Sequence, residues 1–118
     1  MADLKIHIGE DASDMGRRFV SAWKRLEAGA PVDERHLTFA SLQDAAKVLT
    51  PKRIALLRAL HGRPVPTVRA LADSVTRDYK NVHEDVRVLL AAGLIDRDDL
   101  GGLRADYDGI TVAMEIAL

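Results

Sequence analysis

The sequence contains no cysteine and no long apolar run, and neither sign of charge dominates it. Without cysteine the chain has neither a disulfide framework nor a thiolate metal site, which suits a reducing compartment. Nowhere do about eighteen apolar residues follow one another, and no basic start leads into an apolar stretch, so we expect neither a membrane span nor an export signal. We therefore expect a cytoplasmic protein. With 118 residues that are 47% hydrophobic, the chain can form a real core.

The net charge of −1 taken alone argues against a protein that binds nucleic acid, because neutralising phosphates requires clustered lysine and arginine. The charge is nevertheless unevenly distributed. Residues 52–87 contain eight basic and four acidic residues, a balance of +4. Residues 96–118 contain two basic and six acidic residues, a balance of −4. This asymmetry is compatible with a directional binding surface, although a solvated mixed surface is the commoner explanation.

The first third of the sequence predicts short strands and amphipathic helices. Apolar and polar residues alternate in Leu4–Ile8, which is typical of a half-buried strand, and residues 36–39 resemble a second one. Ser41 can cap a helix that follows. A further helix is predicted between the strands, and it ends before Pro31. Its apolar side comprises Met15, Phe19, Ala22, Trp23 and Leu26.

Three short helices are predicted in succession after residue 49. Thr50, Thr67 and Asp78 each supply a side-chain oxygen that can accept a hydrogen bond at a helix N-terminus. Pro51 suits the first helical position, and Gly93 suits the left-handed residue that ends the third helix. The apolar residues expected to face inward recur at helical spacing. They are Ile54, Leu57 and Leu60 in the first helix, Val68, Leu71, Ala72 and Val75 in the second, and Val82, Val86, Leu89 and Leu90 in the third.

Two short arms around Gly101 and Gly102 follow the third helix and predict a β-hairpin. Residues 110–116 alternate again as a strand. The order of helix, helix, capped helix and hairpin is that of a winged helix-turn-helix. We therefore expect a mainly α protein with a small β component, an α+β fold. Residues 1–48 are expected to form a strand-helix dimerisation arm, and residues 49–118 a winged helix-turn-helix domain with a C-terminal strand.

The third helix carries residue types suited to reading DNA on the side away from its predicted core. Lysine and arginine can donate to guanine or to phosphate, and asparagine can bond adenine through two atoms. Glu84 lies within a helical turn of Lys80 and Arg87, so it can pair with either. Tyr79 is expected nearer the core, where packing and a phosphate hydrogen bond are equal alternatives. The proposed groove residues are Arg77, Lys80, Asn81, His83 and Arg87, and those for phosphate are Thr67, Arg69 and Tyr79, with Arg77 also suited to phosphate and Arg97 and Arg104 as contacts from the hairpin arms.

Four segments of the chain resemble a family of small prokaryotic winged-helix transcriptional regulators that is loosely grouped with MarR-like proteins. The segments are LTPKRIALLRAL, VRALADSV, RDYKNVHEDVRVLLAAGLIDRD and YDGITVAMEI, and the resemblance extends from Leu49 to Ile116. Its most specific part is the stretch from Arg77 to His83. In the family pattern the place of Glu84 is often basic, and this departure affects the expected strength or sequence preference of DNA binding.

The resemblance implies control of transcription by a dimer that binds double-stranded DNA. Some members of the family resemble antitoxins, which are encoded beside a toxin and repress their own operon. It therefore implies a homodimeric repressor, with a cognate toxin as a further partner. The protein-binding alternative remains open, because winged helices can bind proteins through the same surfaces and the C-terminal third is acidic.

The sequence does not favour an enzyme, a metal site or a cofactor. His83 and Glu84 begin like a zinc-protease motif, but Arg87 stands where the second histidine is required. The other histidines lie too far apart in the sequence to suggest ligand spacing. The diglycine follows acidic residues and has no lysine-serine pair after it, so it is expected to be a turn rather than a phosphate-binding loop.

Overall fold

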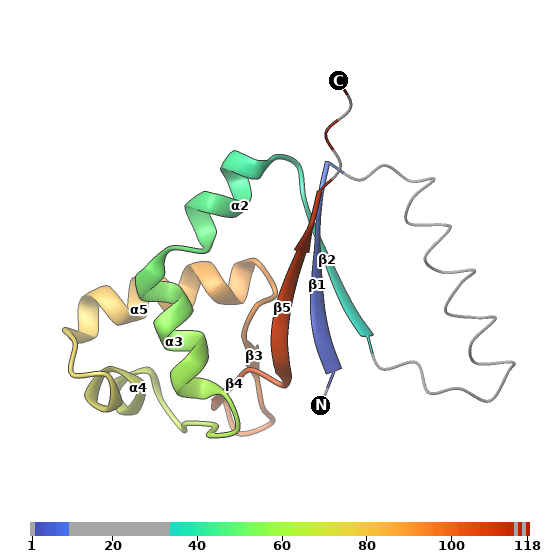
Figure 1. Cartoon of the computed structure of the whole chain (residues 1–118). Helices are drawn as coiled ribbons and strands as arrows, with labels where there is room; N and C mark the ends of the chain where they lie inside the picture. The colour runs from blue at the N-terminus through green and yellow to red at the C-terminus, as the bar shows by residue number, and fades with distance from the viewer. Residues whose placement is uncertain (1, 10–33, 115, 117) are drawn as a thin grey trace, which may run out of the picture. The chain divides into compact units, whose positions relative to one another are not determined.

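The computed structural model describes residues 2–9, 34–114, 116 and 118 (Figure 1). The chain divides into two compact units, one formed by residues 1–45 with 107–118 and the other by residues 46–106. The described residues combine helices with small sheets, so the expected mixture of α and β structure is confirmed. In these residues no helix is long and apolar enough to cross a membrane.

The first unit contains a three-stranded sheet in which every strand pair is parallel. Its strands are β1 (Ala2–Ile8), β2 (Glu34–Phe39) and β5 (Tyr107–Ala113), in the order β2-β1-β5. The strands predicted at residues 4–8 and 36–39 are confirmed, and the C-terminal strand lies slightly earlier than predicted. The helix predicted from Met15 to Leu26 lies outside the described residues.

The two faces of this sheet differ in polarity, as the alternating sequence requires. Leu4 and Ile6 are fully buried, and the register pairs them with Ile110 and Val112 of β5, which share their face. The opposite face carries Lys5, paired with His36 on one side and with Thr111 on the other, and also His7 and Thr38. The face of Leu4 and Ile6 is therefore mainly apolar, with Arg35 of β2 opposite Leu4, and the other face is polar.

Strand β5 was expected to belong with residues 49–118, but it pairs with β1 and lies in the first unit. Alternation of apolar and polar residues predicts a strand and gives no information about its partner. The partner of β5 is about a hundred residues earlier in the sequence. The first unit is thus assembled from both ends of the described chain.

Helix α2 (Leu42–Val48) begins after Ser41, whose Oγ accepts a hydrogen bond from the N–H of Asp44 at 3.1 Å. The second unit then contains α3 (Pro51–Leu60), α4 (Val68–Ser74) and α5 (Tyr79–Ala91). The three predicted N-caps are confirmed. Thr50 accepts from the N–H of Arg53 at 3.3 Å, Thr67 from Ala70 at 3.0 Å and Asp78 from Asn81 at 3.3 Å.

The core of the second unit forms where the apolar sides of α3, α4 and α5 meet the residues after α5. The spacing correctly placed most of these residues, but in α3 it missed Leu56, which is fully buried, while Ile54 is only half-buried. The buried residues are Leu56, Leu57, Leu60, Leu71, Ala72, Val82, Val86, Leu89, Leu94, Ile95, Leu103 and Ala105.

The predicted hairpin is formed by β3 (Asp96–Arg97) and β4 (Leu103–Arg104). Gly101 has a φ of +82°, as its place in the turn suggested. Gly102 is required for another reason, because a Cβ there would lie 2.6 Å from an oxygen of Asp98 and 2.9 Å from the carbonyl oxygen of Val65. The hairpin base therefore packs too closely against its neighbours for any side chain at this position.

Candidate functional site

The outward side of α5 is the candidate site, because polar side chains gather there on a firmly anchored helix. Val82, Val86 and Leu89 are at most 1% exposed and fix the inner side of α5 in the core. The opposite side is exposed, as predicted from the helical spacing. Its side chains belong to Lys80, Asn81, His83, Glu84 and Arg87.

The sequence suggested that Tyr79 lies on the core side of α5. This prediction is wrong, because the Tyr79 side chain is 40% exposed. It is the first residue of the helix, and the guanidinium of Arg69 from α4 lies over its ring, 4.5 Å from the centroid. The ring of His83 lies on the helix next to it, with a centroid separation of 5.7 Å. The three side chains form an exposed group, the Arg69–Tyr79–His83 cluster, in which the aromatic ring holds the arginine beside the outward side of α5.

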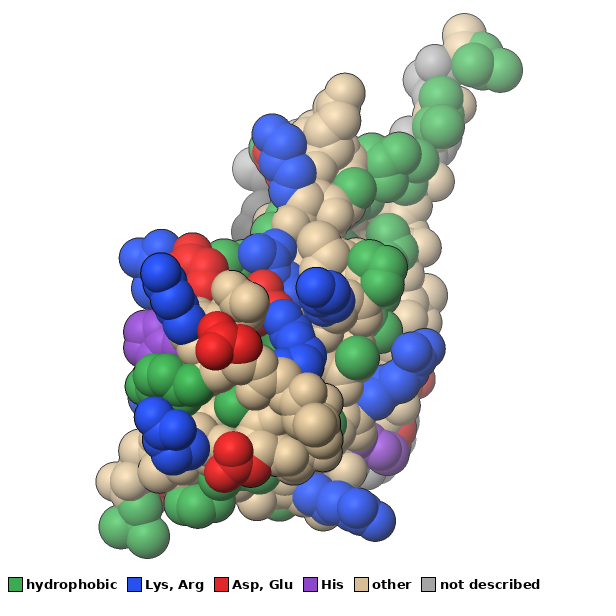
Figure 2. All heavy atoms as spheres, turned by 90° about the vertical axis from the view of Figure 1, so that its left-hand side faces the viewer, with side chains coloured by type: hydrophobic (Ala, Val, Ile, Leu, Met, Phe, Trp, Pro, Cys, Tyr) green, Lys and Arg blue, Asp and Glu red, His purple; other side chains and the backbone are tan. Residues whose placement is uncertain are grey.

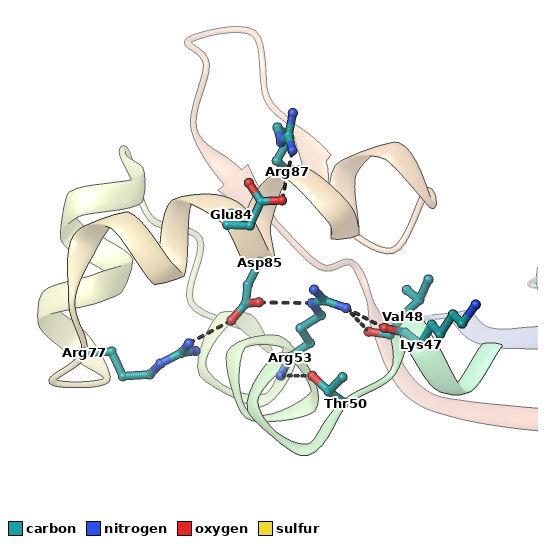
Figure 3. Close-up of polar contacts among 8 residues, drawn as sticks. All are labelled: Lys47, Val48, Thr50, Arg53, Arg77, Glu84, Asp85 and Arg87. Atoms are coloured by element: carbon teal, nitrogen blue, oxygen red, sulfur yellow. Dashed lines mark hydrogen bonds and ion pairs between the residues drawn. The ribbon is translucent and has the colours of Figure 1, made fainter. Parts of the chain in front are cut away.

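Arg77 is turned toward the protein rather than fully outward. Its Nη2 donates to Oδ2 of Asp85 at 2.8 Å, and the two side chains are 21% and 14% exposed (Figure 3). The other oxygen of Asp85 accepts from Nε of Arg53 at 3.1 Å. The charge of Arg77 is therefore paired with Asp85 of the protein itself, although Arg77 was among the predicted groove residues.

Arg53 links this ion pair to the preceding helix. Besides Asp85, it donates through Nη1 to the carbonyl oxygens of Lys47 at 2.6 Å and Val48 at 3.3 Å. Asp85 thus connects α5 to α3 and to the end of α2, as Figure 3 shows. Arg53 and Asp85 were not among the predicted site residues, since nothing local marks a carboxylate that pairs with arginines 8 and 32 residues away.

Glu84 pairs with Arg87 on the outward side, at 2.9 Å between Oε1 and Nη2. Both side chains are well exposed, at 55% and 71% respectively. The hydrogen bond and charge of Arg87 lower the pKa of Glu84, and Glu84 raises the pKa of Arg87. The sequence left Lys80 and Arg87 open as partners, and the structure selects Arg87. A ligand that binds the outward side of α5 therefore meets the carboxylate of Glu84 beside the basic side chain of Arg87.

An open hollow of about 610 Å³ lies beside this side of α5. It is bounded by the first turn of α3 and by Arg77, Asn81, Glu84 and Asp85. Space-filling Figure 2 shows lysine and arginine side chains spread over the face in view, with acidic side chains between them. The surface is therefore mixed in charge rather than uniformly basic.

The remaining predicted residues lie around this surface or on the hairpin. The hydroxyl oxygen of Thr67 serves as a cap acceptor, so its hydrogen is left to donate elsewhere. Arg104 pairs with Asp106 at 2.9 Å, and both are about half exposed. At the hairpin tip Asp98 accepts from the N–H groups of Leu100 and Gly102, and Arg97 donates to the carbonyl oxygen of Gly101. The charges nearest the tip thus stabilise the turn.

No group of three histidine, cysteine or acidic side chains within the described ranges could hold a metal ion. His7 and His36 come together on the polar face of the sheet, with ring nitrogens 2.8 Å apart. A hydrogen bond between two imidazoles accounts for this distance without a metal.

Comparison with known proteins identifies a family for the chain. The model of the HVO_A0114 family matches residues 48–112, which is more than half of the sequence. The chain belongs to the HVO_A0114 family. No curated protein and no solved structure matches it. The matched residues contain all of α3, α4 and α5 and the hairpin, so the candidate site lies inside the part that defines the family.

Proposed function

We propose that the protein binds double-stranded DNA through the outward side of α5 and regulates transcription as a dimer. In this proposal α3, α4, α5 and the β3-β4 hairpin form a winged helix-turn-helix, with α5 in the major groove. The observation that carries the proposal is the division of α5 into a fully buried apolar side and an exposed side with Lys80, Asn81, His83 and Arg87.

The exposed residues of α5 and of its neighbour α4 suit the two kinds of contact made with DNA, those to base edges and those to phosphates. Lys80, Asn81 and Arg87 can donate to base edges, and Asn81 can bond adenine through two atoms. The Arg69–Tyr79–His83 cluster lies at the start of α5, where Arg69 and Thr67 can donate to phosphates and hold the helix in register. Arg77 contributes differently, since its pairing with Asp85 holds the start of α5 in place.

A dimer of this kind reads a roughly palindromic site whose half-sites lie about one helical turn, or a multiple of it, apart. We propose a repressor of its own operon, because a winged helix that occupies an operator can exclude other proteins from that DNA. An antitoxin role is the more specific form of this proposal. A cognate toxin would then bind a surface other than α5.

The proposal is tested by fluorescence anisotropy with DNA from immediately upstream of the protein's own gene and with a scrambled duplex, over a series of salt concentrations. Native DNA should bind more tightly, with an affinity that falls steeply as salt rises. The double variant Lys80→Gln, Arg87→Gln should bind native DNA at least about tenfold more weakly and should discriminate less between the native and the scrambled duplex, since both side chains are assigned to base edges.

The matched control removes the same charge elsewhere. Arg58 and Arg63 are exposed residues of α3 and of the loop after it, so Arg58→Gln, Arg63→Gln loses two positive charges without touching α5. This variant should retain the affinity of the wild type. Equal losses in both double variants would show nonspecific attraction only, and equal weak binding of native and scrambled DNA would refute the autoregulator.

A winged-helix module that binds protein is the second candidate function. The Glu84–Arg87 ion pair favours it, because this pair places a carboxylate on the side of α5 that would face phosphates. If neither duplex binds, a pull-down with the intact protein should recover a partner that is lost in the Lys80→Gln, Arg87→Gln variant.

A further inference from the structure

Among the described residues, strand β5 is paired on one side only. It lies at the end of the sheet order β2-β1-β5, and within the described part of the chain β1 is the strand that pairs with it. Thr111, Val112 and Ala113 are exposed. The outer edge of an end strand carries backbone N–H and C=O groups that can pair with another strand.

The start of β5 carries a charged residue, Asp108, at a register shift in its pairing with β1, but from Gly109 onward the strand lacks the features by which proteins usually prevent such pairing. Edge strands are commonly protected by charged residues, proline or bulges. From Gly109 to Met114 strand β5 and the residue after it contain no charged residue and no proline. The other end strand, β2, differs, since it begins with Glu34, Arg35 and His36. As far as the described residues go, the edge of β5 from Gly109 onward is therefore the less protected of the two.

Exposed apolar side chains gather at the same place. Val112 is 47%, Met114 41% and Ile116 67% exposed. Val112 shares the apolar face of the sheet with Ile6, which is fully buried beside it. A partner strand along β5 would continue the apolar face and cover Val112, whereas a solvent-exposed edge leaves it in water.

We propose that β5 pairs in antiparallel orientation with β5 of a second copy of this chain, so that the two sheets form one six-stranded sheet. A twofold axis perpendicular to the sheet keeps the apolar faces of both copies on the same side. With this axis within one residue of Thr111, the pairing is centred on Gly109–Ala113, which contains no charged residue, and Asp108 lies at the register shift before it. The segment thus matches itself in polarity, and the pairing places no like charges opposite each other.

This inference deepens the proposed function, since it locates the dimer interface that a palindromic site requires. It does not depend on DNA binding, because it concerns the first unit and the candidate DNA surface lies in the second. In the proposed pairing the two Thr111 side chains are directly opposite, about 5 Å apart between Cβ atoms, or diagonal at about 7–8 Å. Like charges at this position therefore repel, and opposite charges attract.

The test is sedimentation equilibrium of Thr111→Lys and Thr111→Glu, separately and mixed in equal amounts, without DNA. The wild type should have twice the 12.9 kDa mass of one chain. Each variant alone should dimerise at least about fivefold more weakly, as expected for roughly 1 kcal/mol of repulsion. The mixture should regain a dimer that contains one copy of each variant.

Thr38 provides the matched control, because it is an exposed threonine on the same face of the sheet but on the other end strand, β2. Thr38→Lys should leave dimerisation unchanged. The proposal is overturned by a monomeric wild type, by undiminished dimers of Thr111→Lys, or by a mixture that does not recover. Circular dichroism checks that each variant is folded.

A second measurement serves if the Thr111 variants do not fold. Amide hydrogen exchange of the wild type should show protection of Gly109–Ala113 that increases with protein concentration, because the outer amides become bonded only in the dimer. Protection independent of concentration would refute the pairing. The Lys80→Gln, Arg87→Gln variant should remain dimeric, so failure of DNA binding and failure of this inference are distinguishable.

Discussion

Thr76 has a left-handed backbone, with a φ of 53°, at the end of α4. The N–H of Thr76 donates to the carbonyl oxygen of Asp73, and that of Arg77 donates to Ala72. The same pair of hydrogen bonds ends α5, where Gly93 occupies the left-handed position with a φ of 80°. A β-branched residue is strained in this conformation, whereas glycine is not.

Thr76→Gly is therefore expected to stabilise the protein. Removing the strain of a side chain in this region raises the free energy of unfolding by about 1–2 kcal/mol. The greater conformational freedom of glycine in the unfolded chain lowers it by about 0.5–1 kcal/mol. The free energy of unfolding, measured with urea, should rise by roughly 0.5–1 kcal/mol. Gly93→Ala is the converse control and should lower it by about 1–2 kcal/mol. A loss of stability in Thr76→Gly would show that the threonine side chain is needed at this turn.

Glu84 is the residue at which charge and proposed function conflict. Its pKa is lowered by Arg87, so the ion pair persists at neutral pH and is lost only as the pH falls through the lowered value. Glu84→Gln should release Arg87 at every pH and remove one negative charge from the outward side of α5. If α5 binds DNA, the affinity measured by anisotropy should rise roughly fivefold at low salt, and the gain should shrink as salt increases. Unchanged affinity would place Glu84 and Arg87 outside the contact.

At the scale of elements, Asp85 joins α5 to α3 through Arg53 and also bonds Arg77 in the segment before α5. Asp85→Asn should weaken both contacts and leave two guanidinium groups without a carboxylate, which costs roughly 2 kcal/mol for partly buried groups. Urea unfolding measures the loss. Asp73→Asn, an exposed residue of α4, should change stability by less than about 0.5 kcal/mol. Equal effects of the two substitutions would contradict the linking role of Asp85.

The elements that the sequence predicted well are those determined by neighbours in the chain. Thr50, Thr67 and Asp78 cap helices through bonds that span three residues, so the signal is complete within one short segment. The outward side of α5 was predictable for the same reason, since it follows from helical spacing.

The contacts that the sequence did not predict join residues far apart in the chain. The position of Tyr79 depends on Arg69 of the preceding helix, and that of Arg77 on Asp85. Spacing within α5 reveals neither. The partner of β5 was also missed, because a period of two predicts a strand without its neighbour.

At the scale of the whole molecule, the two units should respond differently to loss of the C-terminal strand. A chain that ends after Asp106 keeps residues 46–106 but leaves β1 with β2 as its neighbour, and a two-stranded sheet is marginally stable. The methyl NMR signals of Val82 and Leu89 should remain dispersed, while those of Leu4 and Ile6 should collapse toward random-coil positions. Removal of residues 116–118 alone should leave both sets unchanged. Collapse of all four signals in the shorter chain would show that the second unit needs the first.

The pairing of β1 with β5 also has a consequence for synthesis on the ribosome. The second unit is one continuous stretch, so its helices can fold as soon as residue 106 has emerged, whereas β1 lacks β5 until later. At about 5–20 residues per second, the interval between completion of β2 and arrival of β5 lasts several seconds. During that time Leu4 and Ile6 lie on a strand whose second neighbour does not yet exist. One edge of the apolar strand β1 therefore stays open until β5 arrives, and we expect chaperones that bind extended apolar segments to recognise the nascent chain during this interval.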